Sequence, residues 1–204
     1  MRASATANPP AGTPENLPPG TWHLAPGAGG VACPTTNGNR SVMNYYEDFG
    51  VGMRSEIGSH TFTADEIKAF AREFDPQPFH LDEEAAARSH FGALCASGWH
   101  TAAICLRHVV EERHRRQAEL RRRGEPVAKT GPSPGFRDLR WPKPVYAGDT
   151  VTFATEVVAL RDVAKRPDVG LRVARNTGTN QRGDLVYSVL SSTYIERRNK
   201  PGRT

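Results

Sequence analysis

The chain has 204 residues, 37% of them hydrophobic, and a formal net charge of +5, so it is long enough for one domain with a buried core. Its three cysteines lie in no recognisable spacing, so no disulfide framework is expected and a reducing, cytoplasmic environment fits better. The positive charge permits an anionic partner, but no aromatic-interleaved basic motif supports nucleic-acid binding. The most apolar run, residues 93–110, is too often interrupted by polar side chains to span a membrane.

Residues 1–44 differ in composition from the rest of the chain. Seven of the 16 prolines and six of the 19 glycines lie within residues 1–42, where large apolar side chains are few. Such a segment cannot bury enough surface to offset the entropy lost on ordering the chain. We therefore expect residues 1–44 to be a disordered tail, residues 45–198 to form the domain, and residues 199–204 to be a short C-terminal tail.

The domain is predicted to begin with a strand followed by a helix. Residues 52–62 alternate weakly between apolar and polar side chains, which indicates a strand. Thr63 and Glu66 then form a capping-box pattern, and apolar residues follow at helical spacing. Because the residue before a proline is disfavoured in the helical conformation, the helix is expected to end at Asp75, before Pro76.

The next segment is predicted to be a loop that leads into two further helices. Two prolines stiffen the stretch from Asp75 to His80, so we expect an extended turn in which both side chains can converge. A short polar helix is expected over about residues 82–88, and a long helix from about Ser97. The first half of the long helix is apolar and is expected to be buried, whereas its charged second half, residues 111–123, is expected to lie in solvent.

The second half of the chain is rich in strand patterns. Glycines and prolines between residues 124 and 135 separate it from the long helix. A helical first half followed by a strand-rich second half indicates an α+β protein with an antiparallel sheet. The strands are predicted at about residues 135–141, 150–161, 170–176 and 184–196.

Four local patterns occur in order along the chain: Tyr45-Tyr46-Glu47-Asp48-Phe49, Asp75-Pro76-Gln77-Pro78-Phe79-His80, Ser97-Gly98, and the segment from Leu139 to Asp149 that ends in Pro144-Val145-Tyr146-Ala147-Gly148-Asp149. Together they resemble the MaoC-like dehydratases, whose best-known members are (R)-specific enoyl-CoA hydratases of the hot-dog fold. The resemblance covers roughly residues 45–197. It implies a hot-dog fold, in which an antiparallel β-sheet wraps around a long central α-helix, and a homodimer or higher homo-oligomer.

The resemblance also implies roles for individual residues. Asp75 and His80 would hold one catalytic water, and the backbone N–H of Gly98 would polarise a thioester carbonyl. His100, near the start of the long helix, could either line the pocket or be a core histidine. The candidate substrate-binding residues are Gln77, Ser97, Trp99 and His100.

These residue types suit the reversible addition of water to a 2-enoyl thioester. Water adds at C3 and a proton goes to C2, so negative charge develops on the thioester oxygen. A donor aimed at that oxygen contributes about 2.7–4 kcal/mol, and the free N–H groups at a helix start are suitable donors. Histidine suits a general base near neutral pH, and an aspartate can hold the same water. The sequence leaves open which of the two takes the proton first.

We therefore predict an enoyl-CoA hydratase or 3-hydroxyacyl-thioester dehydratase of fatty acid metabolism. Its expected partner is an acyl-CoA or acyl-carrier thioester, with no cofactor besides the coenzyme A of the substrate and no metal, because the histidines lack metal-ligand spacing. A hot-dog thioesterase is one alternative, although such enzymes more often carry a lone carboxylate on the central helix and none lies between Ser97 and Val110. A non-catalytic acyl-CoA-binding or assembly module is the other.

The second half of the long helix carries arginines interleaved with glutamates. Opposite charges three or four residues apart are typical of a solvated helix face with ion pairs. Part of this run could also contact the phosphates of coenzyme A, because guanidinium groups bind phosphate in a bidentate geometry. The arginines are Arg107, Arg113, Arg115, Arg116, Arg121, Arg122 and Arg123.

Overall fold

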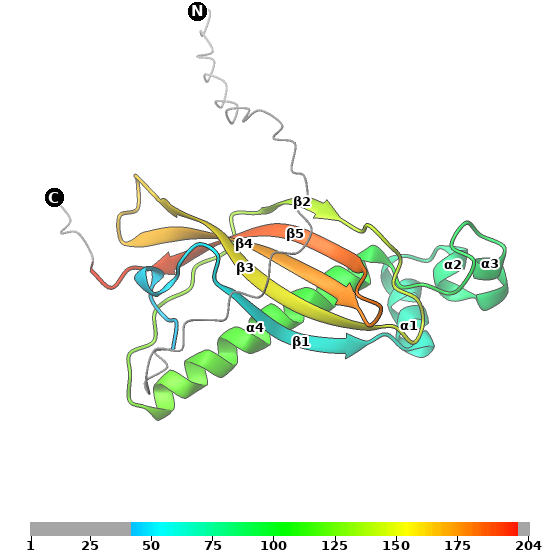
Figure 1. The fold of residues 1–204 in the computed structure, drawn as a ribbon, viewed down its shortest axis with the longest axis horizontal. Helices are drawn as coiled ribbons and strands as arrows, with labels where there is room; N and C mark the ends of the chain where they lie inside the picture. The colour runs from blue at the N-terminus through cyan, green and yellow to red at the C-terminus, as the bar shows by residue number, and fades with distance from the viewer. Residues whose placement is uncertain (1–41, 200–204) are drawn as a thin grey trace, which may run out of the picture. The chain divides into compact units, whose positions relative to one another are not determined.

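The structure is a computed structural model, and it describes residues 42–199 (Figure 1). The expected N-terminal tail lies outside the described residues except for positions 42–44, and the expected C-terminal tail does so except for position 199. The elements in chain order are the 3-10 helix η1 (Tyr46–Asp48), β1 (Arg54–Thr61), α1 (Ala64–Phe74), α2 (Pro78–Leu81), α3 (Glu83–Ala87), α4 (Gly98–Arg122), β2 (Phe136–Arg140), β3 (Thr150–Asp162), β4 (Val169–Asn180) and β5 (Leu185–Glu196).

Five antiparallel strands form one sheet in the order β1-β3-β4-β5-β2 (Figure 1). β3 and β4 pair along nearly their whole length, from Val151 opposite Asn180 to Asp162 opposite Gly170. The long helix α4 packs against strands β1, β3 and β4. A long central helix held by an antiparallel sheet confirms the predicted α+β hot-dog fold, and all predicted strands are present.

One hydrophobic core fills the space between α4 and the sheet. Phe153 and Val186 of the sheet are fully buried, as is Phe62 after β1, and Cys105 of α4 packs among them. Each large apolar side chain removed from water contributes about 1.5–3 kcal/mol. This core fixes the position of α4, and so the position of the α4 N-terminus.

Helix α1 begins and ends where the sequence predicts. The hydroxyl oxygen of Thr63 accepts a hydrogen bond from the backbone N–H of Glu66 at 3.3 Å. The Glu66 carboxylate pairs with His60 Nε2 at 2.6 Å, so it is engaged outside the capping box. The helix ends at Phe74 with Asp75 as its C-cap, as the proline that follows requires.

The segment after Asp75 is not the extended loop that was predicted. Pro78 is the first residue of the one-turn helix α2, and His80 lies inside that helix. A proline is well tolerated at the first helical position because its missing N–H would have no partner within the helix. The prolines therefore end α1 and start α2, so His80 is held by helical geometry.

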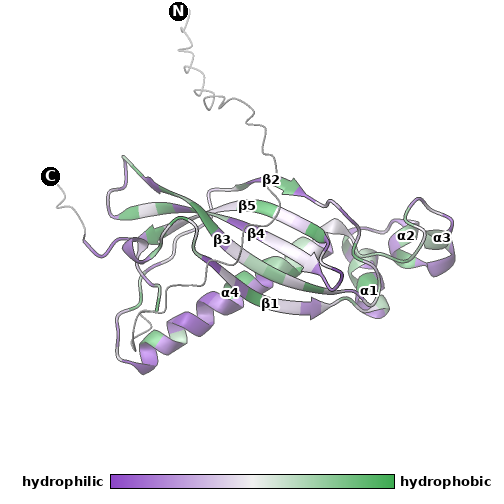
Figure 2. Ribbon diagram, in the orientation of Figure 1, coloured by the Kyte–Doolittle hydropathy of each residue, from purple (hydrophilic) through white to green (hydrophobic). Residues whose placement is uncertain are grey.

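The burial of α4 also differs from the prediction. In the apolar first half, Leu106 is 63% exposed and Trp99 is 54% exposed, whereas Leu120 in the second half is 1% exposed. The second half is mostly hydrophilic (Figure 2), and it forms predicted ion pairs such as Arg116 Nε to Glu112 Oε1 at 2.6 Å. A partly buried face that ends at Leu120 therefore continues along the charged half. No helix within residues 42–199 is both long and apolar enough to cross a membrane.

Candidate functional site

Three short segments bring the predicted acid–base pair together at the end of the domain where α4 starts (Figure 1). Asp75 follows α1, His80 lies in α2, and Ser97 caps α4. Asp75 Oδ2 lies 3.5 Å from His80 Nε2. This distance exceeds that of a normal hydrogen bond. Both residues line the same cavity, described below, so both can contact one small ligand there.

The imidazole of His80 is oriented by a backbone carbonyl. Its Nδ1 lies 2.7 Å from the carbonyl oxygen of Cys95, and the side chain is 6% exposed. A carbonyl oxygen can only accept, so Nδ1 carries the proton that is donated in this bond. In the neutral ring the lone pair is then on Nε2, on the side of Asp75. This arrangement makes Nε2 available as a base.

The carboxylate of Asp75 is held by two donors. Gln77 Nε2 donates to Asp75 Oδ1 at 2.8 Å, and the Ser97 hydroxyl donates to the same carboxylate. Burial raises the pKa of Asp75, but the hydrogen bonds from Ser97 and Gln77 and the nearby His80 outweigh it, so the pKa lies below its usual value. Asp75 is therefore ionised at neutral pH.

Ser97 connects this carboxylate to the start of α4. Its oxygen accepts a hydrogen bond from the backbone N–H of Trp99 at 3.2 Å, as an N-cap does. The residue is 1% exposed. Ser97 also lines the cavity described below, so its predicted role in substrate binding stays a prediction. Its contacts with the helix start and with Asp75 suit it to position that carboxylate.

Gly98 is the first residue of α4, and its N–H is one of the helix-start donors without an intrahelical acceptor. A Cβ at this position would lie 2.6 Å from Cε2 of the Trp141 ring. The sequence suggested that glycine lets a ligand approach closely. The close neighbour in this structure is Trp141, which packs over the helix start.

A cavity of about 440 Å³ lies in front of these groups. Six of the seven predicted site residues line it, namely Asp75, Gln77, His80, Ser97, Gly98 and Trp99. Its other walls are aromatic, proline and aliphatic side chains, with one lysine, one threonine and one cysteine. They include Phe79, Phe91, Trp141, Pro142, Lys143, Pro144 and Val186. A mostly apolar cavity with a few convergent polar groups is typical of a small-molecule site.

His100 is not brought to this cavity. Its ring stacks on Phe70, with 4.6 Å between centroids, and meets Phe62 edge-on. The side chain is buried, and burial lowers its pKa. Its neighbours Trp99 and Thr101 line the cavity, but His100 does not. The candidate role in substrate binding is therefore corrected to one in packing between α1, α4 and Phe62, the residue after β1.

Sequence reasoning did not single out two residues of the cavity wall. Trp141 meets Trp99 edge-on at 5.4 Å, and Lys143 Nζ pairs with Asp184 Oδ1 at 2.6 Å. Both belong to the Leu139–Asp149 segment that carries part of the family resemblance. Nothing in the local sequence of that segment shows that it folds against the start of α4. Trp141 reaches Gly98 because it directly follows β2, which pairs with β5 in the sheet.

Cys95 lines the cavity but is not suited to nucleophilic catalysis. The thiol is buried, and burial raises its pKa to about 11, so it stays protonated at neutral pH. Within residues 42–199, no group of three or more histidine, cysteine or acidic side chains is arranged to hold a metal ion. Asp75 and His80 are therefore the candidate acid–base groups of this cavity.

Comparisons with known proteins agree with the fold. The model of the MaoC-like domain family matches residues 51–178. The chain is 38% identical to a MaoC-like dehydratase from Rhodospirillum rubrum, with a TM-score of 0.63, over 76% of this chain and 98% of that one. It is 29% identical to a monoamine oxidase regulatory protein from Archaeoglobus fulgius, with a TM-score of 0.63, over 76% and 95% of the two chains. It is 30% identical over 151 residues to the uncharacterized protein YdeM of Bacillus subtilis, covering 74% of this chain and 98% of that protein.

The fold and the cavity define a hot-dog protein with an aspartate–histidine pair beside the N-terminus of its central helix. More particularly, the family match spans well over half of the chain. The chain belongs to the MaoC-like domain family.

Proposed function

We propose that this protein catalyses the reversible hydration of a 2-enoyl thioester to a 3-hydroxyacyl thioester, with coenzyme A or an acyl carrier as the thiol. The observation that carries the proposal is the 3.5 Å approach of Asp75 Oδ2 to His80 Nε2 in a cavity of about 440 Å³. The likeness to a protein named a MaoC-like dehydratase supports the same class of reaction.

The first step is the activation of water. Asp75 is ionised and His80 presents a lone pair on Nε2, so one water between them can donate one hydrogen bond to each group. Two donors already engage the Asp75 carboxylate, which makes it the weaker base and the better positioning group. His80 takes one proton of the water as the oxygen attacks C3 of the enoyl group.

The second step is protonation of C2. As the C3–O bond forms, the electron pair of the double bond moves toward the thioester carbonyl and gives an enolate-like oxygen. The N–H of Gly98 and the positive end of α4 are the groups of this chain that can stabilise that oxygen. The imidazolium of His80 then returns its proton to C2. Water is consumed, and His80 regains its starting state.

The test is an assay with crotonyl-CoA that follows the enoyl-thioester absorbance and free thiol in parallel. Loss of absorbance without thiol release supports hydration. Asp75→Asn and His80→Ala should each lower kcat/KM by about 10²–10⁴-fold, the range for loss of an acid–base group. Unimpaired turnover by either variant contradicts the proposal.

Two exposed residues provide matched controls. Asp65→Asn changes a carboxylate on the surface of α1, and His114→Ala removes an imidazole from the surface of α4. Both should leave turnover unchanged. Release of free thiol would assign a thioesterase instead, and ligand-dependent stabilisation without turnover across a panel of longer and branched enoyl-CoAs would assign a binding module.

A further inference from the structure

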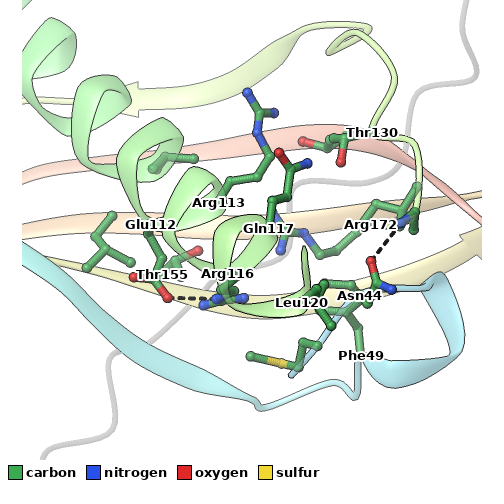
Figure 3. Close-up of a pocket in the computed structure, with 16 residues that line it drawn as sticks. Asn44, Phe49, Glu112, Arg113, Arg116, Gln117, Leu120, Thr130, Thr155 and Arg172 are labelled. Carbon is green, nitrogen blue, oxygen red and sulfur yellow. Dashed lines mark hydrogen bonds and ion pairs between the residues drawn. The ribbon is translucent and has the colours of Figure 1, made fainter. Parts of the chain in front are cut away.

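A second cavity, of about 90 Å³, lies between the second half of α4 and the sheet (Figure 3). At 1.5 Å per residue, the stretch of α4 from Gly98 to Arg113 is about 22 Å long, so this cavity is separate from the one that holds Asp75. Three guanidinium groups line it, from Arg113 and Arg116 of α4 and from Arg172 of β4. We call it the arginine cavity.

Arg116 has a carboxylate partner on the same helix. Arg116 Nε lies 2.6 Å from Glu112 Oε1, and Arg115 contacts the same carboxylate from the solvent side. Within residues 42–199, no carboxylate lies within ion-pair distance of Arg113 or Arg172. The cavity wall therefore carries three positive charges against one negative charge.

Arg172 has the least satisfied side chain of the set. It reaches from β4 toward α4 (Figure 3), and its guanidinium lies over the ring of Phe49, 4.9 Å from the centroid. Its Nε is fully buried and has no hydrogen-bond partner among the described residues. A buried donor without an acceptor destabilises the folded state, and it does so more when the group is charged.

The charge of Arg172 persists at neutral pH. Burial, and then the nearby charges of Arg116 and Arg113, lower the pKa of Arg172 to about 10. Water in the cavity could accept from Nε but would not neutralise the charge. Residues 1–41 contain a single acidic side chain, Glu15, so that segment brings little negative charge of its own.

We propose that the arginine cavity binds an oxyanion of the phosphate class, held by Arg172 and Arg113. A volume of about 90 Å³ has room for several water molecules, at 10–15 Å³ of probe volume each, and so for a tetrahedral oxyanion. Guanidinium forks bind phosphate oxygens in a bidentate geometry. Further donors are within the same wall, from Thr130, Thr155, Thr193 and Gln117.

The oxyanion could be free inorganic phosphate or the phosphate group of a larger phosphoester, since both offer the same chemistry. The test compares thermal unfolding of the full chain in potassium phosphate, in potassium chloride of equal ionic strength, and with adenosine 3′,5′-bisphosphate. At a hundredfold excess over its Kd, the bound anion should raise Tm by roughly 5–10 °C. A rise with phosphate alone identifies the free anion, and a larger rise with the bisphosphate identifies the phosphoester.

Arg172→Met should abolish this rise, and Arg175→Met, an exposed arginine of the same strand, should retain it. Without phosphate, Arg172→Met should unfold at the same or a higher temperature than the unsubstituted protein, because it removes an uncompensated buried charge.

If Arg172→Met fails to fold, Arg113→Gln takes its place. Equilibrium dialysis of radiolabelled phosphate against the unsubstituted protein is then added, and one site per chain is expected. Equal unfolding temperatures in phosphate, bisphosphate and chloride, or a rise that survives in the variant, overturn the proposal. The readout needs no turnover, so it is independent of the proposed hydratase activity.

Discussion

Ser97 allows a test of how folding and the candidate site are connected. Its hydroxyl caps α4 through the N–H of Trp99 and also donates to Asp75. Loss of an N-cap costs about 0.5–2 kcal/mol, and loss of a hydrogen bond to a charged group costs about 1.5–3 kcal/mol. Ser97→Ala should therefore lower the free energy of unfolding by about 2–5 kcal/mol at pH 7.

The matched control is Thr63→Ala, because Thr63 caps α1 through the N–H of Glu66 and has no contact with Asp75. It should cost only about 1 kcal/mol. Urea denaturation followed by circular dichroism measures both variants. Equal losses for the two variants at pH 7 would show that Ser97 is a helix cap and nothing more.

The pH dependence sharpens this test. The pKa of Asp75 is lowered in the folded protein, so its contribution to stability is present above the unfolded value of about 3.9 and is lost as pH falls through the lower folded value. Ser97→Ala removes one cause of the lowering. The difference in stability between the unsubstituted protein and Ser97→Ala should therefore narrow at acidic pH, whereas the difference for Thr63→Ala should stay constant.

Two further substitutions have definite expected outcomes. Gly98→Ala places a Cβ 2.6 Å from the Trp141 ring, which displaces the ring or the helix start. Its kcat/KM for crotonyl-CoA should therefore fall about 10²-fold. The control Gly50→Ala, whose Cβ would meet only the flexible Met53 side chain, should leave kcat/KM unchanged. Asp149→Asn weakens a buried carboxylate bound by Gln181, Arg182 and the N–H of Tyr146. The free energy of unfolding should fall by about 2–3 kcal/mol at pH 7, as measured by urea denaturation. Because the pKa of Asp149 is lowered despite its burial, this difference from the unsubstituted protein should disappear as the medium is acidified below pH 4. A difference that does not depend on pH would contradict this reasoning.

Much of the fold could be predicted because its signals are local. Thr63 and the Asp75–Pro76 pair bound α1 in the sequence as they do in the structure. The strands β2 to β5 follow from alternation and from glycine and proline breaks. The short helix α2 was missed because Pro78 favours both a turn and the first position of a helix, and the choice depends on the contact between His80 and the carbonyl of Cys95.

The candidate site was predicted as far as short-range patterns extend. Asp75 and His80 are five residues apart, and their convergence was expected from the stretch between them. Trp141 is more than forty residues from Gly98, and its packing on the helix start results from the way β2 joins the sheet. For His100 the error was to include a residue that does not line the cavity. Its position in the helix alone does not say which face of α4 meets Phe62 and Phe70.

A comparison of Arg107 of α4 with Arg172 of β4 shows why a charge that faces the interior indicates a ligand. Such a charge does not stabilise the fold by itself. Arg107 faces solvent and pairs with Glu111 at 2.8 Å on the same helix, which suffices for a surface charge. Arg172 lies opposite α4, and burial lowers its pKa, a cost that an apolar side chain of similar length would not carry. Stability alone would favour that apolar side chain. A guanidinium at this position is consistent with a function that needs its charge, and an oxyanion in the arginine cavity supplies the missing negative charge.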